Sequence, residues 1–297
     1  MTLLSAVVCS YNRCESLRDT LRSLKEQSVG GDLSLEIIVV DNNSTDRTRQ
    51  IVEEAAADSP WPIRYIFETR QGIAYARNRG LHAAQGEYVA FIDDDAVADP
   101  DWAASVFRCF EETKADMVGG KVIPLWLAEK PAWITNDLLG PMPRVDYGPA
   151  RKRCAPQETF LTTNCALRRP SAIQYGVFDS TLGRRGQRWV GGEDLELCQR
   201  WIGAGAVVTY EPSAIVHHKV GPERMTPAFY RRWFEDIGYT QAHQMSWKPH
   251  FRISVMPVWR WKEFFSAGVN YFKTRAPLVP EEKKLHTELW WIFQKSF

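Results

Sequence analysis

The sequence has 297 residues, enough for one large domain or two smaller ones. Lysine and arginine number 37 and aspartate and glutamate 36, so the chain carries no global positive field for binding nucleic acid. Hydrophobic residues make up 44% of the chain, as in an ordinary packed globular protein, and no apolar run approaches the ~20 residues that a membrane-spanning helix needs.

The cysteines indicate a reducing environment. The six are scattered and none forms a Cys-x-x-Cys pair, so we expect reduced, buried thiols and no structural zinc site. Residues 3–9 are apolar, but no basic segment precedes them and Tyr11-Asn12-Arg13 follows at once. We therefore interpret them as a first strand rather than a signal peptide, and we expect a cytoplasmic protein.

In chain order, the first half alternates strand and helix patterns. Short apolar runs typical of strands buried on both faces occur at Leu3–Cys9, Leu35–Val40, Ile63–Phe67 and Tyr88–Ile92. Leucines at helical spacing follow the first run, and Ile73–Ala84 is predicted to be helical. This alternation predicts a mostly parallel sheet flanked by helices, with ligands bound at the carboxyl ends of the strands.

The second half is less regular. Residues 124–158 carry several prolines and are expected to form a long loop or insertion. The predicted strands are Met117–Val122, Phe160–Leu167, Val207–Tyr210 and Ala214–His218. The predicted helices are Glu193–Ile202, Thr226–Gln244 and roughly Trp259–Lys273, the last two rich in arginine and aromatic residues.

Three adjacent carboxylates, Asp93-Asp94-Asp95, stand directly after one predicted strand. They repel one another, so such a turn makes chemical sense with a bound cation. Carboxylate oxygens in an Asp-x-Asp arrangement can hold Mg²⁺ or Mn²⁺ together with a diphosphate, and the alternative is an acidic, solvated turn. Asp41 ends another predicted strand, and it either lines the same crevice, begins an Asx-turn, or does both.

A second acidic cluster, Gly192-Glu193-Asp194, opens the later predicted helix. A carboxylate on the first helical turn is favoured by the helix dipole and is available as a general base, although Glu-Asp is also a common signal for a helix start. The two clusters together predict a metal–diphosphate site that faces a general base.

These pieces resemble the inverting family 2 glycosyltransferases of the GT-A fold, roughly from Leu3 to Val220. The matching motifs, in order, are Val7–Arg13, Ile38–Asp46, Gly72 with Ala76-Arg77-Asn78, Phe91–Asp95, Pro100-Asp101-Trp102, Thr163-Asn164, Phe178-Asp179, Gly192–Asp194 and His217-His218. The resemblance implies an α/β fold with a GT-A domain over residues 1–220. A Rossmann-like nucleotide-sugar-binding half (1–123) and an acceptor half (124–220) would compose it, and a helical extension (221–297) would follow.

The resemblance also implies roles for individual residues on the donor side. Asp93 and Asp95 would hold the divalent metal, with Asp95 the more direct ligand. The residues expected to contact the nucleotide sugar are Ser10, Tyr11, Asp41, Asp93 and Asp94. Among these, Ser10, Tyr11 and Asp41 would hold the nucleobase, and Asp94 would face the ribose or the sugar.

On the acceptor side, the resemblance implies Asp194 as the general base, and we expect Glu193 to contact the acceptor. His217 and His218 end an extended segment, where successive side chains face opposite ways. One of them could complete the metal site; His218 suits this role better and His217 would then pack, while a purely structural histidine is the alternative.

The expected donor is a nucleoside diphosphate sugar, a UDP-sugar, and the expected acceptor is a saccharide or a lipid-linked saccharide of the kind used in cell-envelope polysaccharide synthesis. Three tryptophans either stack on sugar faces or pack in the core: Trp126, Trp133 and Trp189. Three arginines meet a pyrophosphate or lipid-linked acceptor, or are simply solvated: Arg184, Arg185 and Arg188.

The C-terminal extension mixes basic and aromatic residues, a composition that suits a helix lying in a membrane interface. The segments concerned are Arg231-Arg232-Trp233, Val258–Lys262, Phe264-Phe265 and Leu289–Phe293. We expect them either to bring the protein to the inner face of the cell membrane or to pack on the catalytic core or in a dimer interface.

Rival functions are disfavoured by particular segments. A nucleotidyltransferase would want a glycine-rich, basic phosphate loop near the first strand, and Ser10–Arg13 has no glycine. A non-catalytic sugar- or nucleotide-binding protein need not keep Asp93, Asp95 and Asp194. A dinucleotide-dependent oxidoreductase would show Gly-x-Gly-x-x-Gly at the first strand–helix turn, which this chain lacks.

Overall fold

The computed structural model describes residues 2–184, 191–245, 252–253, 256–274 and 281–296. The chain divides into two compact units. The first contains Met1–Leu125, Pro143–Gly186 and Gly192–Lys219, and the second contains Trp126–Met142, Gln187–Gly191 and Val220–Phe297. Thus part of the irregular segment after the predicted strand at Met117 groups with the C-terminal helices.

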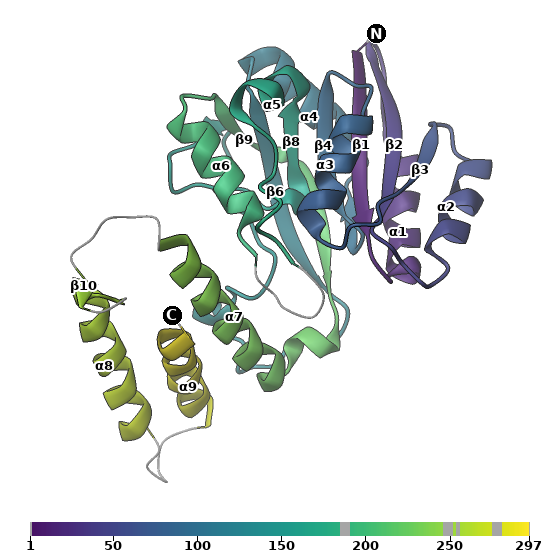
Figure 1. Ribbon diagram of the computed structural model, residues 1–297. Helices are drawn as coiled ribbons and strands as arrows, with labels where there is room; N and C mark the ends of the chain where they lie inside the picture. Colours follow the sequence, from purple (N-terminus) through teal and green to yellow (C-terminus); the bar gives the residue numbers. More distant parts are fainter. Residues whose placement is uncertain (1, 185–190, 246–251, 254–255, 275–280, 297) are drawn as a thin grey trace. The chain divides into compact units, whose positions relative to one another are not determined.

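The first unit is an α/β fold built on one sheet (Figure 1). Its strands are β1 (Thr2–Ser10), β2 (Leu33–Asp41), β3 (Ile63–Phe67), β4 (Tyr88–Asp93), β5 (Ala96–Ala98), β6 (Met117–Trp126), β7 (Lys152–Arg153), β8 (Cys165–Arg168) and β9 (Val208–Val220). Its helices are α1 (Cys14–Lys25), α2 (Thr48–Ala57), α3 (Ile73–Ala83), α4 (Trp102–Thr113), α5 (Arg169–Tyr175) and α6 (Glu193–Gly203).

The sheet is mixed, in the order β3-β2-β1-β4-β8-β6-β9-β5, with β7 paired to β9. The four strands β3, β2, β1 and β4 run parallel, as predicted for the alternating first half. Strand β8 pairs antiparallel with both β4 and β6, and β9 pairs antiparallel with β5 and β7. The expectation of a mostly parallel sheet therefore holds only for the first half, because only there do crossover helices connect neighbouring strands.

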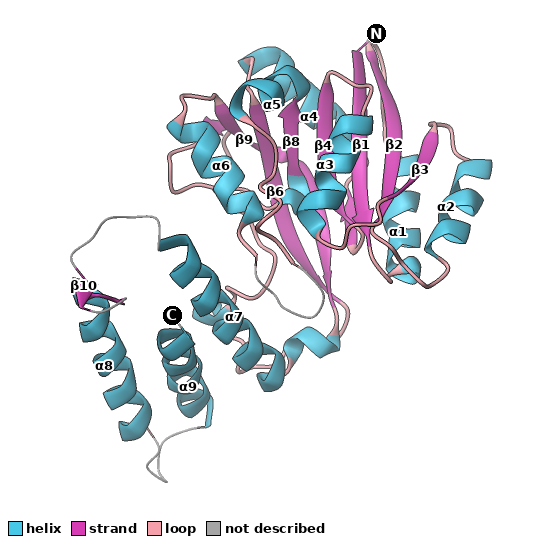
Figure 2. Ribbon diagram, viewed as in Figure 1, coloured by secondary structure: helices cyan, strands magenta, loops and turns pink. Residues whose placement is uncertain are grey.

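Helices cover both faces of this sheet (Figure 2). Because side chains alternate along a strand, Leu4, Ala6 and Val8 of β1 pack with α1, α2 and α4, whereas Val7 packs with the layer that contains α3, α5 and α6. Helix α3 lies especially close to the sheet, since a Cβ atom added to Gly80 would lie 2.4 Å from Val7 Cγ1. The α3 side chains are thus held next to the strand ends.

Two strand predictions in the second half were wrong in extent. In the region of the predicted strand at Phe160, the strand covers only Cys165–Arg168, because Thr162–Asn164 form a 3₁₀ turn whose three polar side chains are buried. The two short strands predicted between Val207 and His218 are one continuous strand, β9. Helices α4 and α5 were not predicted at all.

The second unit is helical. It contains α7 (Pro227–Met245), α8 (Val258–Lys273) and α9 (Glu281–Ser296), together with the short strands β10 (Arg252–Ile253) and β11 (Met256–Pro257). The first two helices agree with the sequence prediction, and α9 was missed although Leu285, Leu289 and Phe293 recur at helical spacing. Among the described residues, no helix is both long and apolar enough to cross a membrane.

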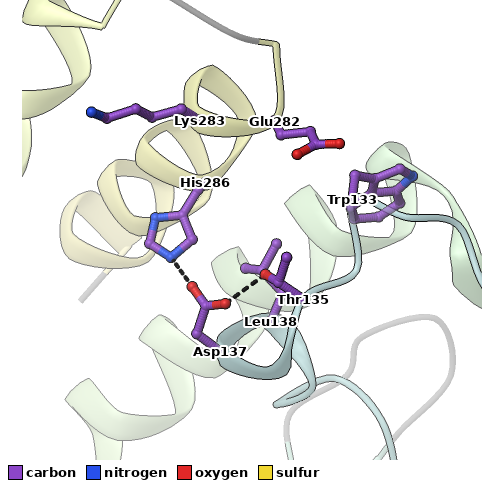
Figure 3. A pocket seen from close by; sticks show the side chains of 7 residues that line it. All are labelled: Trp133, Thr135, Asp137, Leu138, Glu282, Lys283 and His286. Atoms are coloured by element: carbon purple, nitrogen blue, oxygen red, sulfur yellow. Dashed lines mark hydrogen bonds and ion pairs between the residues drawn. The ribbon is translucent and has the colours of Figure 1, made fainter.

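The core of the second unit joins the 126–142 segment to α7 and α9. Ile134, Leu138, Tyr230 and Leu289 are buried together, and Trp126 and Trp133 pack against this cluster. A pocket of about 310 Å³ opens beside it, where Figure 3 shows Trp133 and Asp137 facing α9. His286 Nε2 lies 2.6 Å from Asp137 Oδ2 in this pocket.

Most described aromatic residues of the extension pack within its own unit. Leu289 and Phe293 are buried, and Trp291 packs against Phe264 and Tyr271. Arg231 forms a two-point ion pair with Glu288 of α9. Phe272 and Trp290 remain exposed, at 69% and 45%.

Candidate active site

The acidic turn lies where the sequence places it, at the carboxyl edge of the parallel strands. Asp93 is the last residue of β4 and is paired in register with Cys9 of β1, while Ser10 is paired with Asp41 of β2. The Asp41 and Asp93 carboxylates therefore belong to the same edge, as predicted. Directly after the turn, β5 pairs antiparallel with β9 and sets Ala96 opposite His218.

This pairing brings a histidine to the carboxylates. One ligand atom each from Asp93, Asp95 and His218 lies within 4.8 Å of the others. His218 Nε2 is 3.0 Å from Asp95 Oδ1 and 3.9 Å from Asp93 Oδ2. His218 Nδ1 lies 3.0 Å from the Lys219 carbonyl oxygen, which can only accept, so Nδ1 donates there and Nε2 is the ring nitrogen that faces the two carboxylates.

The neighbouring histidine faces away from this cluster. His217 Nε2 lies 2.9 Å from Asp99 Oδ1, and both side chains are about one-third exposed. The alternation of side chains along β9 thus separates the two histidines, and it is His218 that meets the acidic turn.

The middle carboxylate of the turn, Asp94, has protein partners instead. Ser10 Oγ donates to its Oδ2 at 2.7 Å, and Arg13 Nη1 lies 3.3 Å from its Oδ1. Arg13 also reaches Asp95 Oδ2 at 2.6 Å. Burial raises the pKa of Asp94 to about 7, with Arg13 opposing the shift and Asp95 adding to it.

Asp41 is engaged in a local turn. Its Oδ1 accepts from the Ser44 amide at 2.8 Å and its Oδ2 accepts from the Tyr65 hydroxyl at 2.7 Å, so the Asx-turn predicted as one alternative is present. A carboxylate has about four lone-pair sites, so these two bonds leave capacity for a further donor. Tyr11, two residues beyond the strand position opposite Asp93, is 45% exposed.

The second acidic cluster opens α6, as predicted. Gly192 adopts φ 97° directly before the helix, a conformation that favours glycine, and Glu193 and Asp194 follow on the first turn. Asp194 Oδ1 accepts from the Leu195 amide at 2.8 Å. Burial raises the pKa of Asp194 to about 6, and the neighbouring Glu193 carboxylate adds to the shift.

Glu193 is turned into the protein. Its side chain is 7% exposed and its Oε1 lies 2.5 Å from Arg77 Nη1, while Arg77 Nη2 lies 3.6 Å from Asp93 Oδ1. Burial alone would lower the pKa of Arg77, but the Glu193 and Asp93 carboxylates outweigh it and raise the pKa, so this guanidinium stays charged. Glu196, farther along α6, forms an ion pair with Arg200 at 2.7 Å.

The 3₁₀ turn between β7 and β8 supports the acidic edge. Thr163 Oγ1 donates to Asp93 Oδ2. Asn164, buried beside it, accepts from Trp102 Nε1 at 2.9 Å and donates to the carbonyl oxygens of Lys121 and Ala214 at 2.9 and 2.8 Å. Asn164 therefore ties α4, β6 and β9 together next to the site.

The sequence analysis did not predict every residue of the site, and some predicted residues lie outside the part of the chain that the structure describes. The roles of Arg13 and Thr163 were not predicted, although a basic residue three positions after β1 is an available partner for the carboxylates at that edge. Trp189, Arg185 and Arg188 lie outside the described residues. The carbonyl oxygen of Arg184 accepts from the Ile73 amide at 3.3 Å.

Comparison with known proteins agrees with this architecture. Residues 5–176 match the family described as glycosyl transferase family 2. The chain is 31% identical over 220 residues to a glucosyl-dolichyl phosphate glucuronosyltransferase of Haloferax volcanii, covering 73% of this chain and 69% of that protein. It is also 31% identical over 245 residues to the succinoglycan biosynthesis protein ExoM of Rhizobium meliloti, covering 82% of this chain and 75% of that protein.

A solved structure shows the same fold. The mannosyltransferase PcManGT from Pyrobaculum calidifontis, in complex with GDP-Man and Mn²⁺, superposes with a TM-score of 0.64 over 99% of this chain and 84% of its own, at 19% sequence identity. The predicted GT-A glycosyltransferase fold is thereby confirmed. Given the family match and the two curated relatives, the chain belongs to glycosyl transferase family 2 and is a glycosyltransferase.

Proposed function

We propose that this glycosyltransferase is metal-dependent and inverting, and that it transfers a sugar from a nucleoside diphosphate sugar to an acceptor hydroxyl. The observation that carries the proposal is the grouping of Asp93, Asp95 and His218 at the carboxyl edge of the sheet, on the same unit as the half-buried carboxylate of Asp194. The first group suits a cation and a diphosphate, and the second suits a general base.

The donor atoms fit a hard divalent cation. Two carboxylates and one imidazole whose Nε2 faces them form a set that Mg²⁺ or Mn²⁺ accepts, with Mn²⁺ the better match for a nitrogen ligand. A cation held by Asp93, Asp95 and His218 would neutralise the charge that builds on the departing diphosphate. Arg13 and Thr163 hold the carboxylates in place from the side.

The nucleotide would lie along the neighbouring strand ends. Asp41 has capacity for a hydrogen bond to the base, and exposed Tyr11 offers a ring on which the base can stack. Ser10 is paired in register with Asp41 and donates to Asp94, the residue between the two metal-binding aspartates in the chain, which suits contact of Ser10 and Asp94 with the ribose or the sugar. A UDP-sugar is the donor that we propose.

Asp194 would take the proton from the acceptor hydroxyl as its oxygen attacks the anomeric carbon. A pKa of about 6 leaves the carboxylate ionised at neutral pH and makes it a stronger base than an exposed aspartate. One in-line displacement inverts the configuration at that carbon. A second catalytic carboxylate is unnecessary because the leaving diphosphate is stabilised by the cation rather than by protonation.

The acceptor that we propose is a saccharide, free or linked to a lipid, in the synthesis of an envelope polysaccharide. The relative from Haloferax volcanii is named for a dolichyl phosphate-linked sugar, and ExoM is named for succinoglycan biosynthesis. A lipid-linked acceptor would be reached at the inner face of the membrane. The exposed Phe272 and Trp290 of the second unit suit contact with such a surface.

A donor panel tests the proposal. The protein is incubated with UDP-, GDP-, dTDP- and CMP-activated sugars and Mn²⁺, with and without a mixture of saccharide acceptors, and released nucleotide is measured. We expect acceptor-stimulated release of UDP from one UDP-sugar, with inverted configuration in the product by NMR. Retained configuration, or no acceptor-stimulated release from any donor, would refute the proposal.

A further inference from the structure

Arg77 is a buried cation that meets carboxylates from two separate elements. It projects from α3, in the first half of the first unit, and its side chain is 8% exposed. One guanidinium nitrogen contacts Glu193 at the start of α6, 116 residues away along the chain, and the other faces Asp93 at the end of β4. The two acids therefore share one arginine.

The same turn of α3 is fastened to the other half of the unit by a second contact. Asn78 Nδ2 donates to the Phe178 carbonyl oxygen at 2.8 Å, and the Phe178 amide donates to Asn78 Oδ1 at 3.1 Å. The Phe178 ring in turn lies 5.7 Å from the Arg77 guanidinium carbon. These contacts fix α3 against the segment before α6. In this position, Arg77 of α3 can hold Glu193.

Glu193 has the features of a partner for Arg77 rather than of a surface acid. Its Oε2 is buried and has no hydrogen-bond partner among the described residues, so the carboxylate is held inside by the ion pair. Gly183 packs over it; a Cβ atom there would lie 3.4 Å from the Glu193 carboxylate and 2.7 Å from Ile73 Cγ2. An acceptor would have to displace this cover to reach Glu193.

We propose that Arg77 and Glu193 form a positioning pair that fixes the first turn of α6, and with it Asp194, relative to Asp93. The inference rests on the proposed function, because Asp93 and Asp194 have their catalytic roles there. Asp194 follows Glu193 directly on the helix, so a shift of Glu193 shifts the base. An arginine suits this position because its planar fork addresses two carboxylates at once, whereas a lysine is a single point charge.

Hydrogen exchange tests the pair independently of catalysis. We expect Arg77→Lys and Glu193→Gln to accelerate amide exchange in the first turns of α6 about tenfold, with α1 and α4 unchanged. Arg79→Lys, an exposed position on the same helix, is the matched control and should exchange like the wild type. Unchanged protection of α6 in both pair variants would overturn the proposal, whether or not a donor has been found.

Kinetics then separates positioning from a loss of folded protein. Titration with UDP and Mn²⁺ counts the competent donor sites, and the maximal rate is divided by that count to give kcat per site. We expect Arg77→Lys to bind UDP within about threefold of the wild type and to lose about 10²-fold in kcat per site, because small misplacements of a catalytic group cost this much. The Glu193→Gln loss should be similar, and the double variant should lose less than the product of the two, since both changes break one pair.

Two other kinetic results would overturn the proposal. If Arg77→Lys loses donor sites but keeps the wild-type kcat per site, the pair is only structural. If Glu193→Gln raises KM for the acceptor while Arg77→Lys leaves it unchanged, Glu193 contacts the acceptor instead. Where Arg77→Lys does not fold, Arg77→Met combined with Glu193→Met removes both charges together, and the same exchange and kcat measurements apply to it.

Discussion

Replacing Asp194 by asparagine removes the proposed base while keeping its shape. Asparagine retains the oxygen that accepts from the Leu195 amide at 2.8 Å, so the start of α6 should stay folded. Asp194 is not among the residues grouped around the cation site. We therefore expect binding of UDP and Mn²⁺ to change by no more than about twofold, within the usual range for a substitution remote from the ligand.

The expected kinetic loss follows from the role of the group. A general base contributes about 10²–10⁴-fold to the rate, and at about 1.4 kcal/mol per tenfold this is about 3–5 kcal/mol of transition-state stabilisation. We expect a fall in kcat of that size. The measurement is initial-rate transfer by wild type and Asp194→Asn with the donor identified in the panel, alongside calorimetric titration with UDP.

The same variant should be more stable than the wild type. In the wild type, burial disfavours the ionised carboxylate of Asp194, since its pKa rises from 3.8 to about 6. At neutral pH, above both values, this shift corresponds to a penalty of up to about 3 kcal/mol, which the neutral amide does not carry. Thermal or urea unfolding should show a higher midpoint for Asp194→Asn, the combination of lost activity and gained stability that is typical of catalytic groups.

Glu196→Gln is the matched control, because it removes another carboxylate from the same helix that is paired with Arg200. It should change kcat by less than about twofold. If Asp194→Asn transfers sugar within tenfold of the wild-type rate while binding UDP normally, Asp194 is not the base, and the reasoning from burial and helix position is wrong.

Three further predictions concern the metal, the pH and the core. Chelation should abolish transfer, and Mn²⁺ or Mg²⁺ should restore it. His218→Ala should weaken Mn²⁺ binding at least about tenfold in calorimetry, whereas His217→Ala, on the other face of β9, should not. Equal Mn²⁺ affinities of the two variants would show that His218 is not a metal ligand. Because Asp194 must be ionised to act and its pKa is about 6, kcat/KM should fall about tenfold per pH unit below 6 and level off above it; a flat profile between pH 7 and 5 would contradict this. Asn164→Ala should lower the free energy of unfolding by about 3 kcal/mol or more, because it leaves three buried hydrogen-bond partners unpaired. The control Gln50→Ala, at an exposed position, should change it by less than about 0.5 kcal/mol. Similar urea midpoints for the two variants would show that the Asn164 hydrogen bonds are dispensable.

The pattern of apolar and polar residues was enough to predict the strands in the first half of the fold. Continuous apolar runs located the ends of β1 to β4 to within two residues, because strands buried on both faces need such runs. The acidic turn and the acidic helix start were also visible, since each is a contiguous group whose charges make sense only beside a cation or at a helix N-terminus. The direction of the later strands was not visible, because antiparallel and parallel pairing draw on the same residues.

What only the tertiary structure decided is which distant residues meet. The choice between His217 and His218 depends on the register of β5 against β9, and a shift of one residue would exchange their faces. The partner of Glu193 depends on how closely α3 packs on β1, which Gly80 permits. Sequence shows which groups carry charge, but a buried charge is stable only beside its partner, and that partner is supplied by packing between segments far apart in the chain.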